Sequence, residues 1–209
     1  MSLRTKMKTK RRTSVLEAAE ELFRERGYAG TSLMDIAESA EVSIGTIYTY
    51  FGSKGGIIHE LSRPLISELE QRADKVIQNP PDNAVEAMIS LFKALRLPKD
   101  WQTPNLVRAF DRAQTESDSY IDALISEAKS LTIRKIRSLL DILRYRRSIR
   151  EDLNLDDASF ILEMLMAAHL EYYIYSPEQI SFPQLETMMH RRVRLLFESW
   201  LPANEAKSA

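Results

Sequence analysis

Glycine is confined to the first 56 residues of this 209-residue chain, and residues 57–209 contain none. A domain of that length built from β-strands, or around a nucleotide-binding loop, ordinarily needs glycine for its tight turns and phosphate-binding backbone. We therefore expect residues 57–209 to be entirely helical, with proline and polar residues at the joints. The glycines are Gly27, Gly30, Gly45, Gly52, Gly55 and Gly56.

Composition narrows the class of protein further. Hydrophobic residues make up 44% of the chain, which is enough for a sizeable buried core. The lack of cysteine excludes disulfides and thiol chemistry and fits a reducing cytoplasm. No apolar run approaches the roughly 18 to 20 residues of a membrane span, and the start of the chain has no secretory signal. The net charge is −1, so any nucleic-acid site depends on the local placement of charge.

The first twelve residues form a block of positive charge without an acid. Such blocks are usually disordered, so residues 1–12 are expected to be a flexible basic arm, either a solvated tail or an additional contact to nucleic acid. A helix is then expected from Ser14, whose spacing to Glu17 is that of a capping box, to Gly27. The cations of the arm are Arg4, Lys6, Lys8, Lys10, Arg11 and Arg12.

The next segment has the pattern of a helix-turn-helix. One short helix opens at Thr31-Ser32, the turn is Glu41-Val42-Ser43, and a second short helix covers residues 44–51. Two short helices joined by a turn of three or four residues form this motif, and the helix before them supplies a third wall. The expected core of this unit consists of Leu22, Phe23, Ile36, Val42, Ile47 and Phe51.

The second short helix has the outward residues of a DNA recognition helix, which needs small or polar side chains at its N-terminal end. Gly45 lets the backbone approach a base, and threonines offer a hydroxyl or a methyl group to base edges. Tyrosine hydroxyls, a lysine and a helix N-terminus suit phosphates, although Tyr50 fits core packing equally well. The predicted DNA-binding residues are Thr31, Ser32, Ser43, Ile44, Gly45, Thr46, Tyr48, Thr49, Tyr50 and Lys54.

The motifs of residues 14–60 resemble those of the TetR (tetracycline repressor-like) family. They are Ala18-Ala19-Glu20-Glu21-Leu22-Phe23, Arg26-Gly27-Tyr28, Thr31-Ser32-Leu33-Met34-Asp35-Ile36-Ala37 and Val42-Ser43-Ile44-Gly45-Thr46-Ile47-Tyr48-Thr49-Tyr50-Phe51-Gly52-Ser53-Lys54. The resemblance implies a DNA-binding domain whose positions matching Thr31, Ile44, Gly45, Thr46, Tyr48, Thr49 and Lys54 commonly touch DNA.

Two positions depart from the TetR pattern. Glu41 stands in the turn where the family usually has glycine, and a positive φ there costs glutamate about 1 kcal/mol. Gly55-Gly56 opens the fourth helix, where the family more often has Lys-Glu, and each interior glycine weakens a helix by up to about 1 kcal/mol. If this soft start tunes signalling, Gly55→Glu and Gly56→Ala are expected to tighten or desensitise the response.

The remaining helices are expected to form a ligand-sensing and dimerisation domain, as the resemblance implies. Helices are expected over residues 54–78, 83–96, 104–115, 119–146, 156–175 and 183–200. The resemblance places a dimer interface on the last two, whose wide apolar stripes fit either an internal core or a partner helix. The predicted interface residues are Phe160, Met164, Ala168, Tyr172, Met189, Val193, Leu196, Phe197 and Trp200.

A ligand pocket is a weaker prediction, because its candidate residues fit ordinary core packing as well. His169 is the most polar of them and suits either a hydrogen-bonded core position or a ligand contact. The three histidines lack metal-ligand spacing, so we expect no metal and no cofactor. A basic stretch that includes Lys129, Lys135 and Arg137 suits either an anionic ligand such as an acyl-CoA, or nucleic acid, or pairing with acids. The pocket candidates are Met88, Phe92, Trp101, Phe110, Tyr120, Met166, His169 and Tyr173.

We therefore expect an all-α protein with a basic arm (residues 1–12), a three-helix DNA-binding domain (residues 13–53) and a helical sensor domain (residues 54–209). The function expected is a transcriptional regulator, a repressor that an unknown small-molecule effector releases from a palindromic DNA operator. It is expected to be a cytoplasmic homodimer and not an enzyme, because no nucleophile–base pair or glycine loop is evident. The alternative is a ligand-independent DNA-organising or protein-interaction module with the same DNA-binding head.

Overall fold

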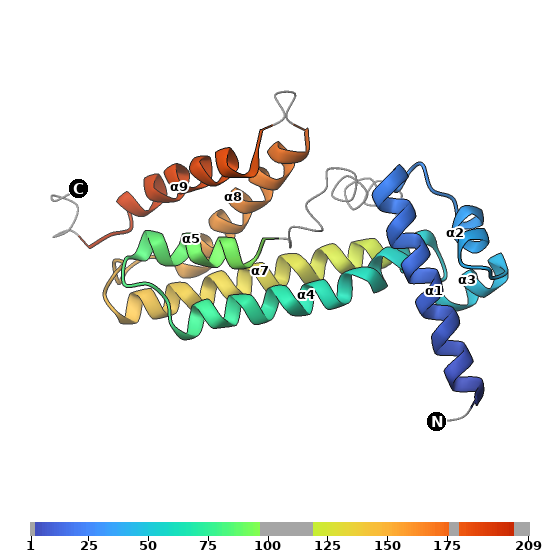
Figure 1. Ribbon diagram of the computed structural model, residues 1–209. Helices are drawn as coiled ribbons and strands as arrows, with labels where there is room; N and C mark the ends of the chain where they lie inside the picture. Colours follow the sequence, from blue (N-terminus) through green and yellow to red (C-terminus); the bar gives the residue numbers. More distant parts are fainter. Residues whose placement is uncertain (1–2, 97–118, 176–179, 203–209) are drawn as a thin grey trace. The chain divides into compact units, whose positions relative to one another are not determined.

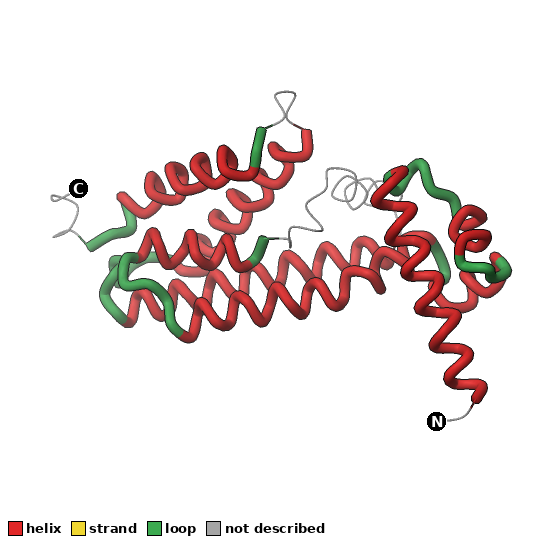
Figure 2. The backbone as a smooth tube through the Cα atoms, in the orientation of Figure 1, coloured by secondary structure: helices red, strands yellow, loops and turns green. Residues whose placement is uncertain are grey.

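The computed structural model describes residues 3–96, 119–175 and 180–202, and its described secondary structure is helical throughout (Figure 2). The all-α prediction is confirmed. None of the described helices combines the length and apolarity that a bilayer crossing requires. The helix predicted over residues 104–115 lies outside the described residues. The helices are α1 (Leu3–Arg26), α2 (Leu33–Ser39), α3 (Ile44–Phe51), α4 (Lys54–Gln78), α5 (Ala84–Ala94), α7 (Ser119–Tyr145), α8 (Leu155–Tyr175) and α9 (Phe182–Glu198) (Figure 1).

The chain forms two compact units. Unit 1 comprises residues 1–67 and 97–127, and unit 2 comprises residues 68–96 and 128–209. Helices α1, α2 and α3 belong to unit 1, and α5, α8 and α9 belong to unit 2. The long helices α4 and α7 each contribute their first turns to unit 1 and their remaining turns to unit 2.

Unit 1 is built around the core that the sequence predicts. Five of the six expected residues are buried, and Val42 packs against them while partly exposed. The sequence pattern missed Tyr28, which is 1% exposed, and the contributions of Ile57, Ile58 and Leu124 from α4 and α7. Burial of each large apolar side chain stabilises the fold by about 1.5 to 3 kcal/mol, so this core holds α1, α2 and α3 in place.

The ends of α2 and α3 are set by local hydrogen bonds. Ser32 and Asp35 form a capping box, and the hydroxyl and N–H of Ser32 lower the pKa of the Asp35 carboxyl. The Ser43 hydroxyl accepts a hydrogen bond from the Thr46 N–H at 3.2 Å. Gly52 ends α3 at a φ of +73°, with its N–H on the Tyr48 carbonyl. A side chain rarely adopts that backbone geometry, so glycine fixes the end of the helix.

Helix α1 begins at Leu3, so the prediction of a flexible arm ahead of Ser14 was wrong. Ser14 does not cap a helix, because its hydroxyl donates to the Lys10 carbonyl one turn earlier. No glycine or proline interrupts residues 3–26, and Lys, Arg and Met have helix propensities close to that of alanine. Arg12 also pairs with Glu60 of α4, which ties the extended part of α1 to the rest of unit 1.

Glu41 occupies the turn between α2 and α3 at a φ of +53°, as the departure from the TetR pattern suggested. We expect Glu41→Gly to raise the free energy of unfolding by about 0.5 to 1 kcal/mol, because it removes the clash of Cβ with the backbone. Denaturant unfolding measures this. Glu41→Gln keeps Cβ and is the matched control, for which no gain is expected. A Glu41→Gly variant no more stable than Glu41→Gln would show that the turn is unstrained.

Unit 2 has a larger core of α4, α5, α7, α8 and α9 residues. Part of the predicted dimer interface lies inside it: Val193, Phe197 and Trp200 are buried within the subunit. The apolar stripe of α9 therefore faces its own core, and these three residues are corrected from partner contacts to core residues. The backbone supports this packing, because the Arg150 N–H donates to the Trp200 carbonyl at 2.8 Å.

Candidate nucleic-acid interface

Helix α3 has one buried and one exposed face. Ile47 and Phe51 point into the core of unit 1, whereas Gly45, Tyr48 and Thr49 are exposed. The Tyr48 side chain is 55% exposed, so more than half of its surface is available for a contact outside unit 1. The outward face of the helix therefore consists of a tyrosine, a threonine and, at Gly45, backbone without a side chain.

Gly45 stands in open space. A Cβ added there would meet nothing nearer than the Ser43 hydroxyl at 3.9 Å, and the φ of Gly45 is not positive. No neighbour within unit 1 requires glycine at this position, although glycine weakens a helix relative to alanine. The lack of a side chain is thus useful only to a surface that approaches α3 from outside.

The other polar side chains at the start of α3 form hydrogen bonds with one another or with the backbone of the helix. The hydroxyls of Ser43 and Thr46 lie 2.9 Å apart, and Thr49 donates to the Gly45 carbonyl at 2.7 Å. This bond uses the hydroxyl hydrogen of Thr49, so its oxygen remains an acceptor and its methyl group remains available for a base contact. Ser43 and Thr46 thus stabilise the start of α3, and their contact with base edges stays a prediction.

Two predicted phosphate contacts, Thr31 and Lys54, form hydrogen bonds within unit 1. Thr31 is 1% exposed, and its hydroxyl donates to the carbonyls of Leu22 and Gly27. Lys54 donates to the carbonyls of Tyr28 and Thr31 at 2.9 and 3.2 Å, and its Nζ lies 3.8 Å from the centre of the Tyr28 ring. The burial of Thr31 corrects its assignment as a DNA contact, whereas a contact by Lys54 stays a prediction.

Tyr50 and Ser32 also have partners within unit 1. The Tyr50 ring packs against the core and meets Phe51 edge-on, with ring centroids 6.3 Å apart. This favours the core-packing alternative for Tyr50. Ser32 is exposed, but its hydroxyl donates to Asp35 at 2.5 Å, so its main role is the capping box.

The pocket candidates that the structure describes belong to both units. Met88 and Phe92 are buried in the core of unit 2, and Met166 packs against that core while partly exposed. Tyr120 lies in unit 1, where its ring would be 3.4 Å from a Cβ added at Gly52. The ring centroids of Tyr120 and His59 are 5.9 Å apart, and the two rings are tilted by 56°. Trp101 and Phe110 are outside the described residues.

His169 is a buried, hydrogen-bonded histidine, which is the core position that the sequence suggested as one alternative. It is 1% exposed, with Nδ1 2.7 Å from the Leu165 carbonyl and Nε2 3.0 Å from the Arg192 guanidinium. A carbonyl accepts and a guanidinium donates, so these bonds select the neutral ring protonated on Nδ1. Burial lowers the pKa of His169, and the charge of Arg192 lowers it further, against the opposing Leu165 bond.

A lowered pKa in the folded state means that stability is complete above the ordinary value of 6.5 and is lost as pH falls below it. We expect the free energy of unfolding to fall between pH 7.5 and 5.5, and to fall less in a His169→Gln variant, whose amide keeps both hydrogen bonds without titrating. His190→Gln removes a histidine from α9 and serves as the control. If His169→Gln loses stability on acidification as steeply as the unaltered chain, another group is responsible.

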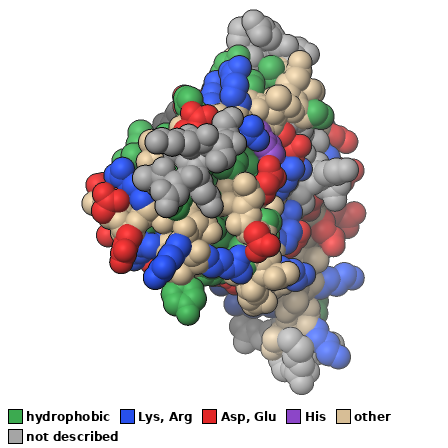
Figure 3. Space-filling model, turned by 90° about the vertical axis from the view of Figure 1, so that its left-hand side faces the viewer, with side chains coloured by type: hydrophobic (Ala, Val, Ile, Leu, Met, Phe, Trp, Pro, Cys, Tyr) green, Lys and Arg blue, Asp and Glu red, His purple; other side chains and the backbone are tan. Residues whose placement is uncertain are grey.

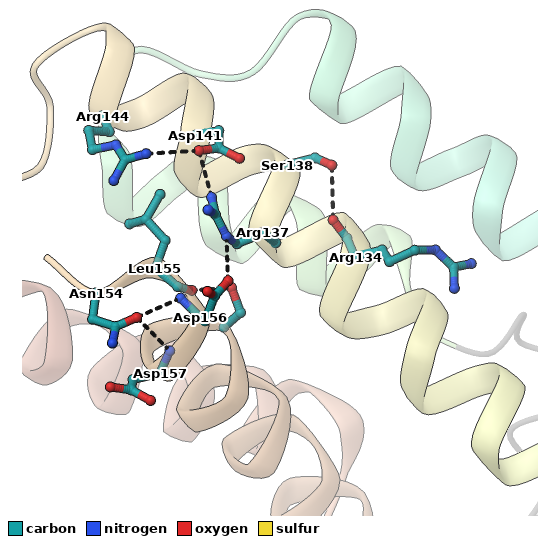
Figure 4. Close-up of polar contacts among 10 residues, drawn as sticks. Arg134, Arg137, Ser138, Asp141, Arg144, Asn154, Leu155, Asp156 and Asp157 are labelled. Atoms are coloured by element: carbon teal, nitrogen blue, oxygen red, sulfur yellow. Dashed lines mark hydrogen bonds and ion pairs between the residues drawn. The ribbon is translucent and has the colours of Figure 1, made fainter.

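The basic stretch of α7 is paired with acids. Arg137 contacts Asp141 and Asp156 at 2.5 and 2.9 Å (Figure 4). Lys135 contacts Asp74 and Glu70 at 2.6 and 3.1 Å. On the face of the molecule seen in Figure 3, acidic and basic side chains are interspersed. These contacts favour pairing over a site for an anionic ligand or nucleic acid.

Helices α2 and α3 form a helix-turn-helix, and the outward face of α3 has the features of a DNA recognition helix. A model of the family described as bacterial regulatory proteins, tetR family, matches residues 15–61. This N-terminal segment is therefore similar in sequence to the tetR family of bacterial regulatory proteins.

Relatives among known proteins are regulators. HTH-type transcriptional regulator HbdR of Aromatoleum sp. is 37% identical over 73 residues, which cover 35% of this chain and 32% of HbdR. An HTH-type transcriptional repressor of Mycobacterium tuberculosis is 29% identical over 142 residues, which cover 62% of this chain and 74% of that repressor. The chain matches 32 to 38% of the length of HbdR and of two Bacillus subtilis regulators.

Solved structures share the fold over nearly the whole chain. The TetR-family repressor FadR of Thermus thermophilus, in complex with lauroyl-CoA, has a TM-score of 0.69 and 23% identity over 91% of this chain and 95% of that one. The fatty acid degradation regulator FadR of Bacillus halodurans has a TM-score of 0.67 and 17% identity over 87% and 96%. The similarity therefore extends in fold well beyond the segment that is similar in sequence.

Proposed function

We propose that the chain is a sequence-specific DNA-binding transcriptional regulator rather than an enzyme. In this proposal it is a repressor that leaves its operator when a small-molecule effector binds. The observation that carries the proposal is the outward face of α3, where Gly45 is bare and Tyr48 is exposed without a need for either in the fold. A helix-turn-helix with such a face is suited to entering the major groove of DNA.

Each exposed group of α3 has a role in this proposal. The backbone at Gly45 approaches a base edge, and the Thr49 methyl group contacts an apolar base surface such as the thymine methyl. The Tyr48 hydroxyl reaches a phosphate and sets the orientation of the helix. Residues 13–53 form the DNA-binding domain, and residues 54–209 form the sensor and dimerisation domain.

A homodimer is the second part of the proposal. Three large side chains of α8 are 40 to 53% exposed in the subunit, namely those of Phe160, Met164 and Tyr172. Ala168, at the same four-residue spacing, is also exposed. An apolar face of this kind on one helix suits a self-complementary contact across a two-fold axis. Two recognition helices related by such an axis read half-sites of a palindrome about 34 to 36 Å apart.

The effector acts in this proposal by population shift. It favours a state whose recognition helices are wrongly spaced for DNA, and it can do so only through a higher affinity for that state. A shift from 1:99 to 99:1 needs a difference in affinity of about 10⁴-fold. The complex of the Thermus repressor with lauroyl-CoA supports a small-molecule effector as a class, because the two folds are similar.

A mobility-shift titration tests the DNA-binding part of this proposal. The chain is titrated against the DNA upstream of its own gene, beside a scrambled duplex of the same composition, at two salt concentrations. The proposal predicts tighter binding to the upstream duplex and weaker binding of both at high salt. Equal affinity for both duplexes would require selection from a random pool, and the lack of any preference there would refute the proposal.

A further inference from the structure

The N-terminal turns of α1 are a positively charged surface with no evident role in the core of unit 1. We call residues 4–12 of α1 the basic turns. They contain six cations and no acid, and the side chains of Lys6, Lys8, Lys10 and Arg11 are exposed. The apolar packing of α1 into unit 1 involves residues from Val15 onward. In Figure 1 the first turns of α1, in dark blue, extend past α2 and α3.

The basic turns lie beside the end of the recognition helix. The Lys8 ammonium is 5.8 Å from the centre of the Tyr50 ring, and the Arg12 guanidinium is 5.6 Å from that of Phe51. Arg12 also pairs with Glu60 of α4. Because these contacts join α1 to the last turn of α3, the charge of the basic turns is held beside the C-terminal end of the candidate recognition helix.

The electrostatics of the basic turns disfavour the helix that they form. Lys6 and Lys10 are four residues apart, as are Lys8 and Arg12, and like charges at this spacing repel each other on a helix surface. Cations at the N-terminus also oppose the helix dipole, whose positive end lies there. A polyanion beside the basic turns would relieve both effects.

We propose that the basic turns bind the DNA backbone that flanks the half-site contacted by α3. This inference rests on the proposed function, since it adds a second DNA contact to the same domain. At 1.5 Å per residue the basic turns are about 13 Å long, enough to lie along about four base pairs. Phosphates carry no sequence information, so this contact adds affinity and salt dependence without adding selectivity.

The test uses the full chain and a Lys6→Gln/Lys10→Gln variant on a duplex that the unaltered chain has selected from a random pool. The slope of log affinity against log salt is expected to become shallower by about 1 for each cation that contacts a phosphate. We expect a loss of affinity of about tenfold or more, with the preference over a scrambled duplex retained. Lys75→Gln/Lys93→Gln makes the same charge change on exposed lysines of α4 and α5 and is expected to leave the slope unchanged.

A second measurement locates the contact on the DNA. Removal of about four base pairs from each end of the duplex should weaken binding of the unaltered chain and leave the Lys6→Gln/Lys10→Gln variant nearly unaffected. A variant slope equal to that of the unaltered chain, or equal changes in both double variants, would overturn the inference while the proposed function stands. Failure of the unaltered chain to prefer any duplex would overturn both.

Discussion

A Gly45→Glu variant is expected to keep its fold and to lose selective DNA binding. The new side chain projects into open space, where the nearest atom to its Cβ is the Ser43 hydroxyl at 3.9 Å. Glutamate has a better helix propensity than glycine and an acid suits the first turn of a helix, so the free energy of unfolding should stay the same or rise by up to about 1 kcal/mol. The carboxylate would oppose the phosphates, and its bulk would keep the backbone from a base.

The expected loss of affinity for the preferred duplex is at least about 100-fold, or about 2.8 kcal/mol. Gly45→Ala is the matched control: it should gain stability by up to about 1 kcal/mol and lose less affinity, since it adds bulk without charge. Denaturant unfolding and a mobility-shift titration measure the two effects separately. Full DNA affinity of the Gly45→Glu variant would show that α3 does not contact DNA. Loss of the fold would show that Gly45 has a structural role.

Gly56→Ala is expected to destabilise the protein by about 3 kcal/mol or more, the upper range for overpacking. A Cβ at this position would lie 1.9 Å from the Phe51 carbonyl oxygen and 2.9 Å from its carbon. These are backbone atoms at the end of α3, so they cannot move aside as a flexible side chain would. The change must therefore displace the start of α4 from the end of α3.

This result would reverse the expectation from helix propensity alone, by which alanine stabilises an interior helical position by up to about 1 kcal/mol. The effect of Gly56→Ala on the response to an effector stays a prediction, and the expected loss of stability has to be separated from it. Thermal and denaturant unfolding measure the loss, with Gly45→Ala as the glycine-to-alanine control in open space. A Gly56→Ala variant as stable as the unaltered chain would show that α3 and α4 separate at little cost.

Much of unit 1 could be predicted because its signals are local. The bounds of α3 and α4 follow from Ser43, Gly52 and Ser53, which act on backbone groups a few residues away. The positive φ of Glu41 was likewise inferred from one departure in a short turn. Capping residues and turn glycines specify such features without reference to the rest of the chain.

The features that could not be predicted from the sequence are mostly contacts between residues that are not adjacent in the chain. Nothing near Thr31 indicates that its hydroxyl bonds to Leu22, and nothing near Lys54 indicates that it reaches the carbonyl of Tyr28. The apolar stripe of α9 fits a partner helix or its own core equally well, and only the packing of unit 2 places Val193 inside. The charge of residues 1–12 indicated disorder, whereas residues 3–12 are helical, in line with their helix propensity.

The most direct test of the central claim is selection of DNA from a random pool by the full chain, with Gly45→Glu in parallel. The account predicts that the unaltered chain enriches a palindrome with half-sites about one helical turn apart, and that Gly45→Glu enriches none. If the unaltered chain enriches no motif, or if both chains enrich the same one, the outward face of α3 does not read DNA.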